Sequence, residues 1–460
     1  MFAVPAAGQD ESRLAAEFRK EGAAIRESCG DFNFKSLLGC AVTLATDQPL
    51  HVALGNLAPQ NGFGFGAAFV DHYTPNENWR LSWNVDGVAA TSGSWRTGVY
   101  MKMIRTAVEP IGVIRPGTQP RADGGAIREY PIINLYAQAI SLKKLYYFGA
   151  GQDSTPDGKS VFSEKQTIVG SNAIWPLPRP SAAPWLRASL IGAINGRFVD
   201  VKGNTSESVP SIDVLYNDLT APGLSSQPGF AQFEEGIRIS PRWLTGRVQG
   251  NYLIDFQQFV AASDSHSSFH RWTIDLKHDF PLYSTAQSAS TRREFNGPNE
   301  CLPALGSDSC PPVVLSRNRG GTVGFRFLVT ESTASDPNVV PFYFQPTLGG
   351  SDINGTTFLN SYEDYRFRGP KLIAFQESFE HSIWGPVGFT FLAEQGRVAQ
   401  QSEDLDLGDL KHSFLVGLTL RAGGFPQIAF TFAWGGNEGH HASATMMSEL
   451  LGGSARPSLY

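Results

Sequence analysis

A polar stretch with two arginines stands directly before a segment that has the pattern of a strand. Residues 355–380 have the sequence GTTFLNSYEDYRFRGPKLIAFQESFE, in which one residue separates Arg366 from Arg368. Arginine forms paired, charge-assisted hydrogen bonds with carboxylates, and these are stronger in partly desolvated surroundings than in bulk water. The chemistry that this stretch offers is therefore ion pairing rather than the making or breaking of bonds.

Patterns typical of enzymes are missing from the sequence. It has no G-x-S-x-G elbow, no H-E-x-x-H pair and no glycine-rich phosphate loop. His266 and His270 would share one face of a strand, but about 13 Å along a strand would separate them, too far for one metal ion. We therefore expect no enzyme activity, no cofactor and no metal site.

The four cysteines form two close pairs, Cys29 with Cys40 and Cys301 with Cys310. Neither pair has the C-x-x-C spacing or the nearby histidines of a zinc site. Two local disulfides in an oxidising compartment fit this arrangement, and four unpaired buried thiols are the alternative.

Composition favours an all-β protein. Only 17% of the 460 residues are charged, 12% are aromatic, and 48 are glycine. The net charge of −6 argues against a nucleic-acid partner, which would need a surplus of lysine and arginine on one face. Apolar runs stay well below the roughly 18 to 20 residues of a membrane-spanning helix.

Alternation of apolar and polar residues is the strongest signal in the chain. In residues 79–86, WRLSWNVD, each apolar side chain is followed by a polar one, as on a strand with two different faces. The pattern persists for about 9 to 11 residues in many segments, which is long enough to cross a bilayer at a tilt. We predict sixteen strands, at residues 62–70, 78–90, 94–104, 131–142, 145–151, 161–174, 185–199, 231–240, 244–261, 266–281, 319–332, 371–383, 387–398, 411–421, 427–435 and 440–450.

The expected fold is a 16-stranded antiparallel transmembrane β-barrel over residues 61–460. Residues 1–60 form a leader with a short amphipathic helix around residues 14–25. This segment is either a surface helix or a disordered leader, or it serves as a plug inside the barrel or as a periplasmic cap. Residues 105–130, 200–230 and 333–370 would be long loops on one rim, opposite short turns. Residues 282–318 are the exception, a long connection on the rim of short turns.

The stretch at 341–370 and the strands after it resemble the C-terminal barrel of the bacterial surface antigen superfamily, which includes barrel-assembly insertases and two-partner secretion transporters. In that family the loop after the eleventh strand folds back into the barrel and carries a V/L-R-G-F/Y tip whose arginine pairs with inward-facing acids. The resemblance implies a loop motif and two lumen carboxylates, namely Leu359, Asn360, Ser361, Tyr362, Arg366, Phe367, Arg368 and Gly369 with Glu377 and Glu394.

This sequence departs from the family pattern at the tip, where Asn360 and Ser361 replace arginine and glycine. We therefore expect Arg366 or Arg368 to pair with Glu377 or Glu394 instead. Strict alternation would place Glu377 on the apolar face, so this expectation requires a bulge.

The resemblance implies a monomeric barrel in the bacterial outer membrane, in contact with the lipid bilayer. Two function classes follow: assembly or translocation of proteins with a separate periplasmic partner, since the family's periplasmic transport domains do not precede the predicted barrel here, or a passive pore or structural barrel. A lipid hydrolase is a distant third.

The cysteines give a first test. In protein exported in its native host, we expect Cys29 linked to Cys40 and Cys301 linked to Cys310, as observed by peptide mapping without reduction. Recovery of four free thiols would contradict an oxidising location.

Overall fold

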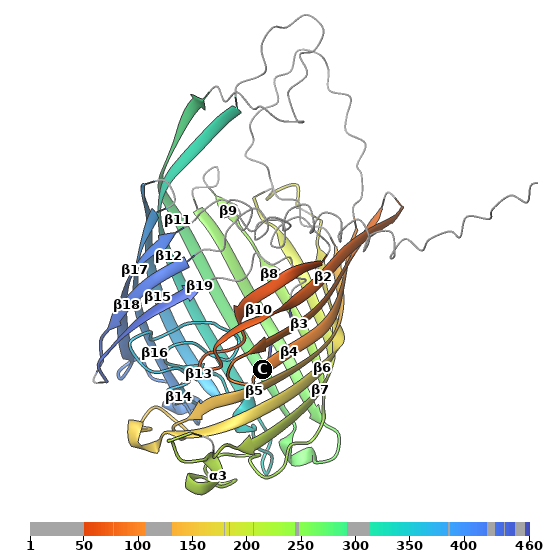
Figure 1. The fold of residues 1–460 in the computed structure, drawn as a ribbon, viewed down its shortest axis with the longest axis vertical. Helices are drawn as coiled ribbons and strands as arrows, with labels where there is room; N and C mark the ends of the chain where they lie inside the picture. Colours follow the sequence, from red (N-terminus) through yellow and green to blue (C-terminus); the bar gives the residue numbers. More distant parts are fainter. Residues whose placement is uncertain are drawn as a thin grey trace, which may run out of the picture.

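The computed structural model of the protein describes residues 50–76, 78–105, 131–178, 180–183, 185–205, 207–243, 248–291, 313–384, 387–420, 428–436, 438–446 and 456–460. In these ranges the chain forms a sheet of 17 strands rolled around a central space (Figure 1). One of them, β9, has two residues, which leaves sixteen long strands.

The sheet contains β1 Leu50–Asn56, β2 Phe63–Asn76, β3 Trp79–Ala90, β4 Trp95–Arg105, β5 Ile132–Tyr147, β6 Ser160–Pro176, β7 Ala188–Gly203, β8 Phe230–Ile239, β9 Arg242–Trp243, β10 Val248–Ala261, β11 Phe269–Thr291, β12 Val313–Thr333, β15 Lys371–Trp384, β16 Val387–Ala399, β17 Lys411–Leu420, β18 Ile428–Trp434 and β19 His440–Met446. The connections carry β13 Thr347–Leu348, β14 Phe367–Arg368, α3 Ile212–Leu215 and the short helices η1 Pro156–Gly158, η3 Ser265–Ser267, η4 Phe342–Phe344 and η5 Ser402–Asp404. Long strands that follow one another in the sequence pair antiparallel.

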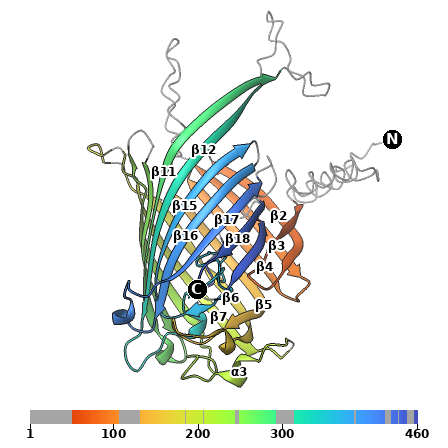
Figure 2. The same ribbon diagram turned by 90° about the vertical axis from the view of Figure 1, so that its left-hand side faces the viewer.

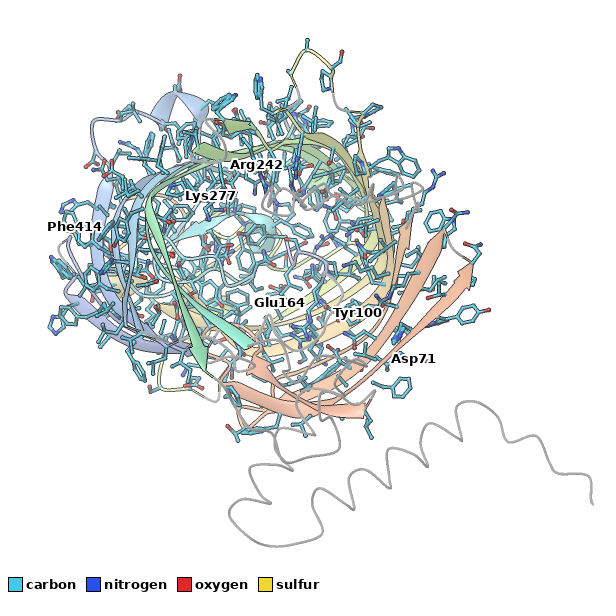
Figure 3. All side chains as sticks on the ribbon, turned by 90° about the horizontal axis from the view of Figure 1, so that it is seen from above. Asp71, Tyr100, Glu164, Arg242, Lys277 and Phe414 are labelled. Carbon is cyan, nitrogen blue, oxygen red and sulfur yellow. The ribbon has the colours of Figure 1, made fainter. Side chains whose placement is uncertain are left out.

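Polar side chains face the lumen and apolar side chains face outward. On β3, Asn84 and Asp86 are buried, whereas Trp83 and Val85 are exposed. Figure 3 shows the same division, with Phe414 outside the ring of strands and Glu164 within it. Other buried charges belong to Arg96, Arg197, Asp255, Arg271 and Glu394, and other exposed apolar side chains to Phe65, Val99, Leu135, Val169, Ile194, Phe198, Phe325, Leu418 and Phe430. An apolar exterior around an ionic interior is the pattern of a barrel in a bilayer.

The predicted number of strands is confirmed, but two errors in it cancel. The short strand β1 was missed, because both faces of LHVALGN carry small or apolar residues. Residues 131–142 and 145–151 were predicted as two strands, whereas β5 runs through both with a bulge between Leu142 and Leu145. The barrel thus includes Leu50, and the predicted boundary at residue 61 is wrong. The expected amphipathic helix lies outside the described residues.

Because β1 was not predicted, one of the long loops was assigned to the wrong rim of the barrel. Connections alternate between rims, so with one extra strand at the start, β4 ends and β5 begins at the rim opposite the loop at 334–370. The predicted placement of the connection at 105–130 on the same rim as that loop is therefore wrong. Residues 204–229 do share a rim with residues 334–370, as predicted. We call this the loop rim.

Both ends of the connection predicted at 282–318 are strand rather than loop, and residues 292–312 between them lie outside the described residues. β11 extends to Thr291 and β12 begins at Val313, and these two strands pair with each other far beyond their contacts with β10 and β15. Figure 2 shows the resulting hairpin projecting from the rim opposite the loop rim.

Aromatic side chains of the loop at 334–370 pack against the inner wall of the lumen near the loop rim. Phe342 and Phe344 of η4 are fully buried. Phe342 lies 5.2 Å from the Tyr147 ring and 5.3 Å from the Phe162 ring, between centroids, and Phe344 lies 5.0 Å from Phe230. Such edge-to-face contacts are favourable beyond the area they bury. The centre of the core is therefore formed by a loop that packs against the inner wall.

No helix within the described ranges is long and apolar enough to cross a membrane.

The extensive pairing of neighbouring strands predicts how the protein behaves in detergent. Because the strands satisfy each other's backbone groups, the barrel should resist unfolding by dodecyl sulfate until it is heated. Unheated and boiled samples should migrate differently in gels. A protein that stays soluble and monomeric without detergent would contradict the membrane barrel.

Candidate functional site

The candidate site is the connection between β12 and β15, residues 334–370, which we call the inserted loop. Inside it, β13 pairs with β14, and backbone hydrogen bonds join Gly349 and Gly350 to Phe358 and Leu359. Gly349 and Gly350 have φ values of +99° and +56°, in the left-handed region that glycine adopts without strain. Leu359 and Tyr365 also have positive φ, at 55° and 63°, which side chains with a Cβ rarely adopt. The loop therefore holds one defined shape.

The loop tip, residues 359–362, is attached to the inner wall through Glu394 on β16. Asn360 donates to this carboxylate from its backbone N–H at 2.9 Å and from its side-chain amide at 2.8 Å. Gln376 on β15 donates to the same carboxylate at 2.8 Å, and the Ser361 N–H donates to Ser413 Oγ on β17 at 2.9 Å. A carboxylate with several donors is well satisfied even when buried. Asn360 thus binds the acid that the family's arginine would bind.

Apolar contacts hold the same tip. Leu359 is fully buried, Tyr362 is 4% exposed, and the Phe367 ring lies 5.1 Å from the Tyr362 ring. A Cβ at Gly436, in the β18–β19 connection, would come within 1.9 Å of the Tyr362 hydroxyl. Only glycine fits this close approach.

Glu377 does not face the lumen, so its prediction as a lumen carboxylate is wrong. It pairs in register with Phe325 on β12 and Ala393 on β16, on the outer face of β15. Its neighbour Gln376 reaches Glu394 inside. The register of β15 shifts only between Ser382 and Trp384, so no bulge turns Glu377 inward.

Arg366 lies in the barrel but pairs with Glu438 rather than with Glu394. Its Nε and Nη2 each donate to the Glu438 carboxylate at 2.7 Å, and Nη1 and Nη2 donate to Ser154 Oγ and O at 2.8 and 2.6 Å. Its guanidinium carbon lies 4.6 Å from the Phe367 ring centroid. The predicted pairing is wrong because Glu394 is already occupied by Asn360 and Gln376.

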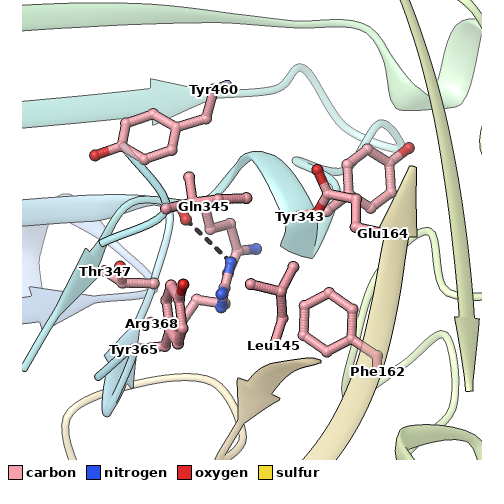
Figure 4. A pocket seen from close by; sticks show the side chains of 10 residues that line it. Leu145, Phe162, Glu164, Tyr343, Gln345, Thr347, Tyr365, Arg368 and Tyr460 are labelled. Atoms are coloured by element: carbon pink, nitrogen blue, oxygen red, sulfur yellow. Dashed lines mark hydrogen bonds between the residues drawn. The ribbon is translucent and has the colours of Figure 1, made fainter. Parts of the chain in front are cut away.

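Arg368 is also buried, and its charge faces backbone carbonyls. Its Nη1 donates to the Phe342 oxygen at 2.8 Å and to the Gln345 oxygen at 3.3 Å. Figure 4 shows the second of these bonds. Burial lowers the pKa of Arg368 from its ordinary value, and the nearby Tyr147 and Glu164 oppose this shift. Arg368 therefore secures the aromatic η4 rather than the loop tip, contrary to the prediction.

Gly369 ends the loop where β16 passes close by. A Cβ there would lie 2.9 Å from the Ala399 carbonyl oxygen. Its N–H donates to the Pro346 oxygen at 3.4 Å, which closes the base of the β13–β14 pair.

Sequence analysis missed Glu438, Ser154 and the aromatic η4. Glu438 and Ser154 lie in connections between strands, where alternation gives no signal. The run Phe342–Phe344 between two prolines did carry a signal, since three adjacent aromatic residues in a loop need somewhere to be buried.

A polar cavity of about 660 Å³ lies beside the inserted loop. Charged residues of both signs line it, among them Arg197, Glu234, Asp255, Arg271 and Arg326. Within the described ranges, no group of three or more metal-ligating side chains is found. The four cysteines lie outside these ranges.

Comparisons with protein-family models and with curated proteins found no match. Comparison with solved structures found the fold. CdiB from Escherichia coli matches with a TM-score of 0.50 and 12% identity over 87% of this chain and 62% of that one. CdiB from Acinetobacter baumannii matches with a TM-score of 0.49 and 11% identity, over 87% of this chain and 60% of that one. BamA from Haemophilus ducreyi lacking POTRA domains 1–3 matches with a TM-score of 0.46 and 9% identity, over 86% of this chain and 70% of that one.

This chain spans about three fifths of the length of the CdiB structures. The match to CdiB from Escherichia coli confirms the fold: the chain has a 16-stranded barrel architecture similar to that of this structure, as the resemblance implied. This architecture agrees with the expected location in the bacterial outer membrane. The apolar exterior of the barrel would contact the lipid bilayer there.

Glu394 and Glu377, which lie on opposite faces of the wall, provide a matched test of how the loop tip is attached. Glu394→Ala would leave the Asn360 and Gln376 donors without their partner, at a cost of about 1–3 kcal/mol each. The loop should open more often, and protease cleavage within residues 355–365 should become at least about thirtyfold faster.

Glu377→Ala removes the same charge from the outer face of the neighbouring strand and should leave the cleavage rate unchanged. Equal effects of the two substitutions would contradict the attachment of the loop tip at Glu394.

Proposed function

We propose that this barrel acts in the assembly or translocation of outer-membrane proteins, together with a separate periplasmic partner. The observation that carries the proposal is the inserted loop, whose tip is bonded to the wall at Glu394 in a barrel of the CdiB fold.

The loop connects distant parts of the wall. Its tip contacts β16 and β17 through Glu394 and Ser413. Arg366 joins the β5–β6 connection at Ser154 to the β18–β19 connection at Glu438. A change in the position of one wall strand would therefore displace the loop. Such coupling between wall and loop suits a barrel that must accommodate a polypeptide.

The loop also argues against a simple open pore. The aromatic cluster around Phe342 and Phe344 packs against the inner wall near the loop rim, where it takes up space that an open pore would leave to solvent. The alternative function is a passive pore or structural barrel. The polar cavity of about 660 Å³ would support a pore only if the inserted loop left the lumen.

Reconstitution into liposomes separates the two functions. The barrel should increase the rate at which an added outer-membrane protein folds into the vesicles, while its own single-channel conductance stays low. Glu394→Ala should reduce the gain in folding rate several-fold, and Glu377→Ala should not. Steady open conductance without any effect on folding would support the passive pore instead.

The expected periplasmic partner can be identified in parallel by cross-linking in the native host, followed by purification of the barrel. A partner is expected at the rim opposite the loop rim.

A further inference from the structure

Residues 456–460, Arg-Pro-Ser-Leu-Tyr, lie inside the barrel and have no part in the site described above. Ten positions separate Arg456 from Met446, the last residue of β19. The segment contacts β3, β6 and β11 of the wall and the inserted loop. It therefore joins the loop to three separate strands.

Two amide side chains clamp the main chain of one residue of this segment. Gln166 Nε2 on β6 donates to the Leu459 carbonyl oxygen at 3.0 Å, and the Leu459 N–H donates to Asn354 Oδ1 in the loop at 2.7 Å. Gln166 is 1% exposed. Hydrogen bonds to the main chain are how proteins bind extended peptides of varied sequence.

Contacts on either side of this clamp recognise particular side chains. Arg456 Nη2 lies 3.1 Å from Asp86 Oδ2, whose side chain is 2% exposed. The Tyr460 hydroxyl bonds to Asp352, and the Arg271 guanidinium carbon lies 5.6 Å from the Tyr460 ring centroid. Asp352 is itself held in place by the backbone N–H groups of Asn354 and Thr356.

We propose that the lumen contains a peptide-binding site and that the segment 456–460 is its resident ligand. The site takes an extended peptide that carries an arginine and, four residues later, a tyrosine. Asp86 binds the arginine, Gln166 and Asn354 bind the main chain, and Asp352 with Arg271 binds the tyrosine. The site is independent of the proposed function, since its evidence is the set of contacts alone.

The resident segment can be exchanged because it borders open space. Arg456, Ser458 and Tyr460 line the cavity of about 660 Å³, and Arg456 and Ser458 are exposed to it. A ligand joined to its site by a short connection has an effective concentration on the order of millimolar. The segment therefore excludes free peptides at lower concentrations, and weakening it should open the site to them.

The test uses a fluorescent peptide of sequence RPSLY and the full chain in detergent. In the double variant Arg456→Glu with Tyr460→Ala, the peptide should bind saturably, at least about tenfold tighter than to the unaltered protein, as followed by fluorescence anisotropy. A peptide of sequence EPSLA should bind the same variant about tenfold more weakly or worse, because it lacks both recognised side chains.

A wall substitution locates the binding. Adding Gln166→Ala to the double variant should weaken RPSLY binding several-fold, whereas adding Glu377→Ala, on the outer face, should not. Heat-modifiable migration reports whether each variant is folded.

Equal peptide binding to the unaltered protein and to the folded double variant would overturn the proposal, as would no binding to the folded double variant. If the double variant does not fold, Tyr460→Ala alone provides the same comparison with a smaller change. Absence of binding to that folded single variant would then overturn it.

Discussion

A charged group can stay inside this barrel only where protein donors or acceptors replace the water that it loses. Glu394 meets this condition through Asn360 and Gln376, and Arg366 meets it through Glu438 and Ser154. A buried donor left without its acceptor costs about 1–3 kcal/mol, so these contacts fix the position of the loop. The aromatic packing of η4 and the clamp on Leu459 both depend on that position.

The strands could be predicted because the bilayer and the wet lumen impose opposite demands on successive residues. This held for β3, whose charged residues Arg80 and Asp86 share one face, and for β10, whose single charged residue Asp255 is buried in the lumen. It failed for β1, which has few polar residues to mark a face. It also failed in β5, where the bulge after Leu142 breaks the alternation for two residues and mimics a turn.

The loop was predicted to enter the lumen, but its partners were not. Glu438 is 72 positions after Arg366, and only the folded barrel brings the β18–β19 connection beside the loop. The replacement of arginine by Asn360 seemed to leave Glu394 unpaired, yet a side-chain amide and a backbone N–H together satisfy it. For Glu377 the simple rule of alternation was correct, and the position carried over from the family was not.

The long hairpin of β11 and β12 makes one rim of the barrel uneven. β11 leaves its contacts with β10 at Asp279 and continues to Thr291, which at about 3.3 Å per residue corresponds to roughly 40 Å of strand. β18 and β19 have only seven residues each. Within the described residues the wall is therefore taller along β11 and β12 than along β18 and β19, so a molecule that approaches this rim from the side of the hairpin meets the hairpin before it reaches the opening.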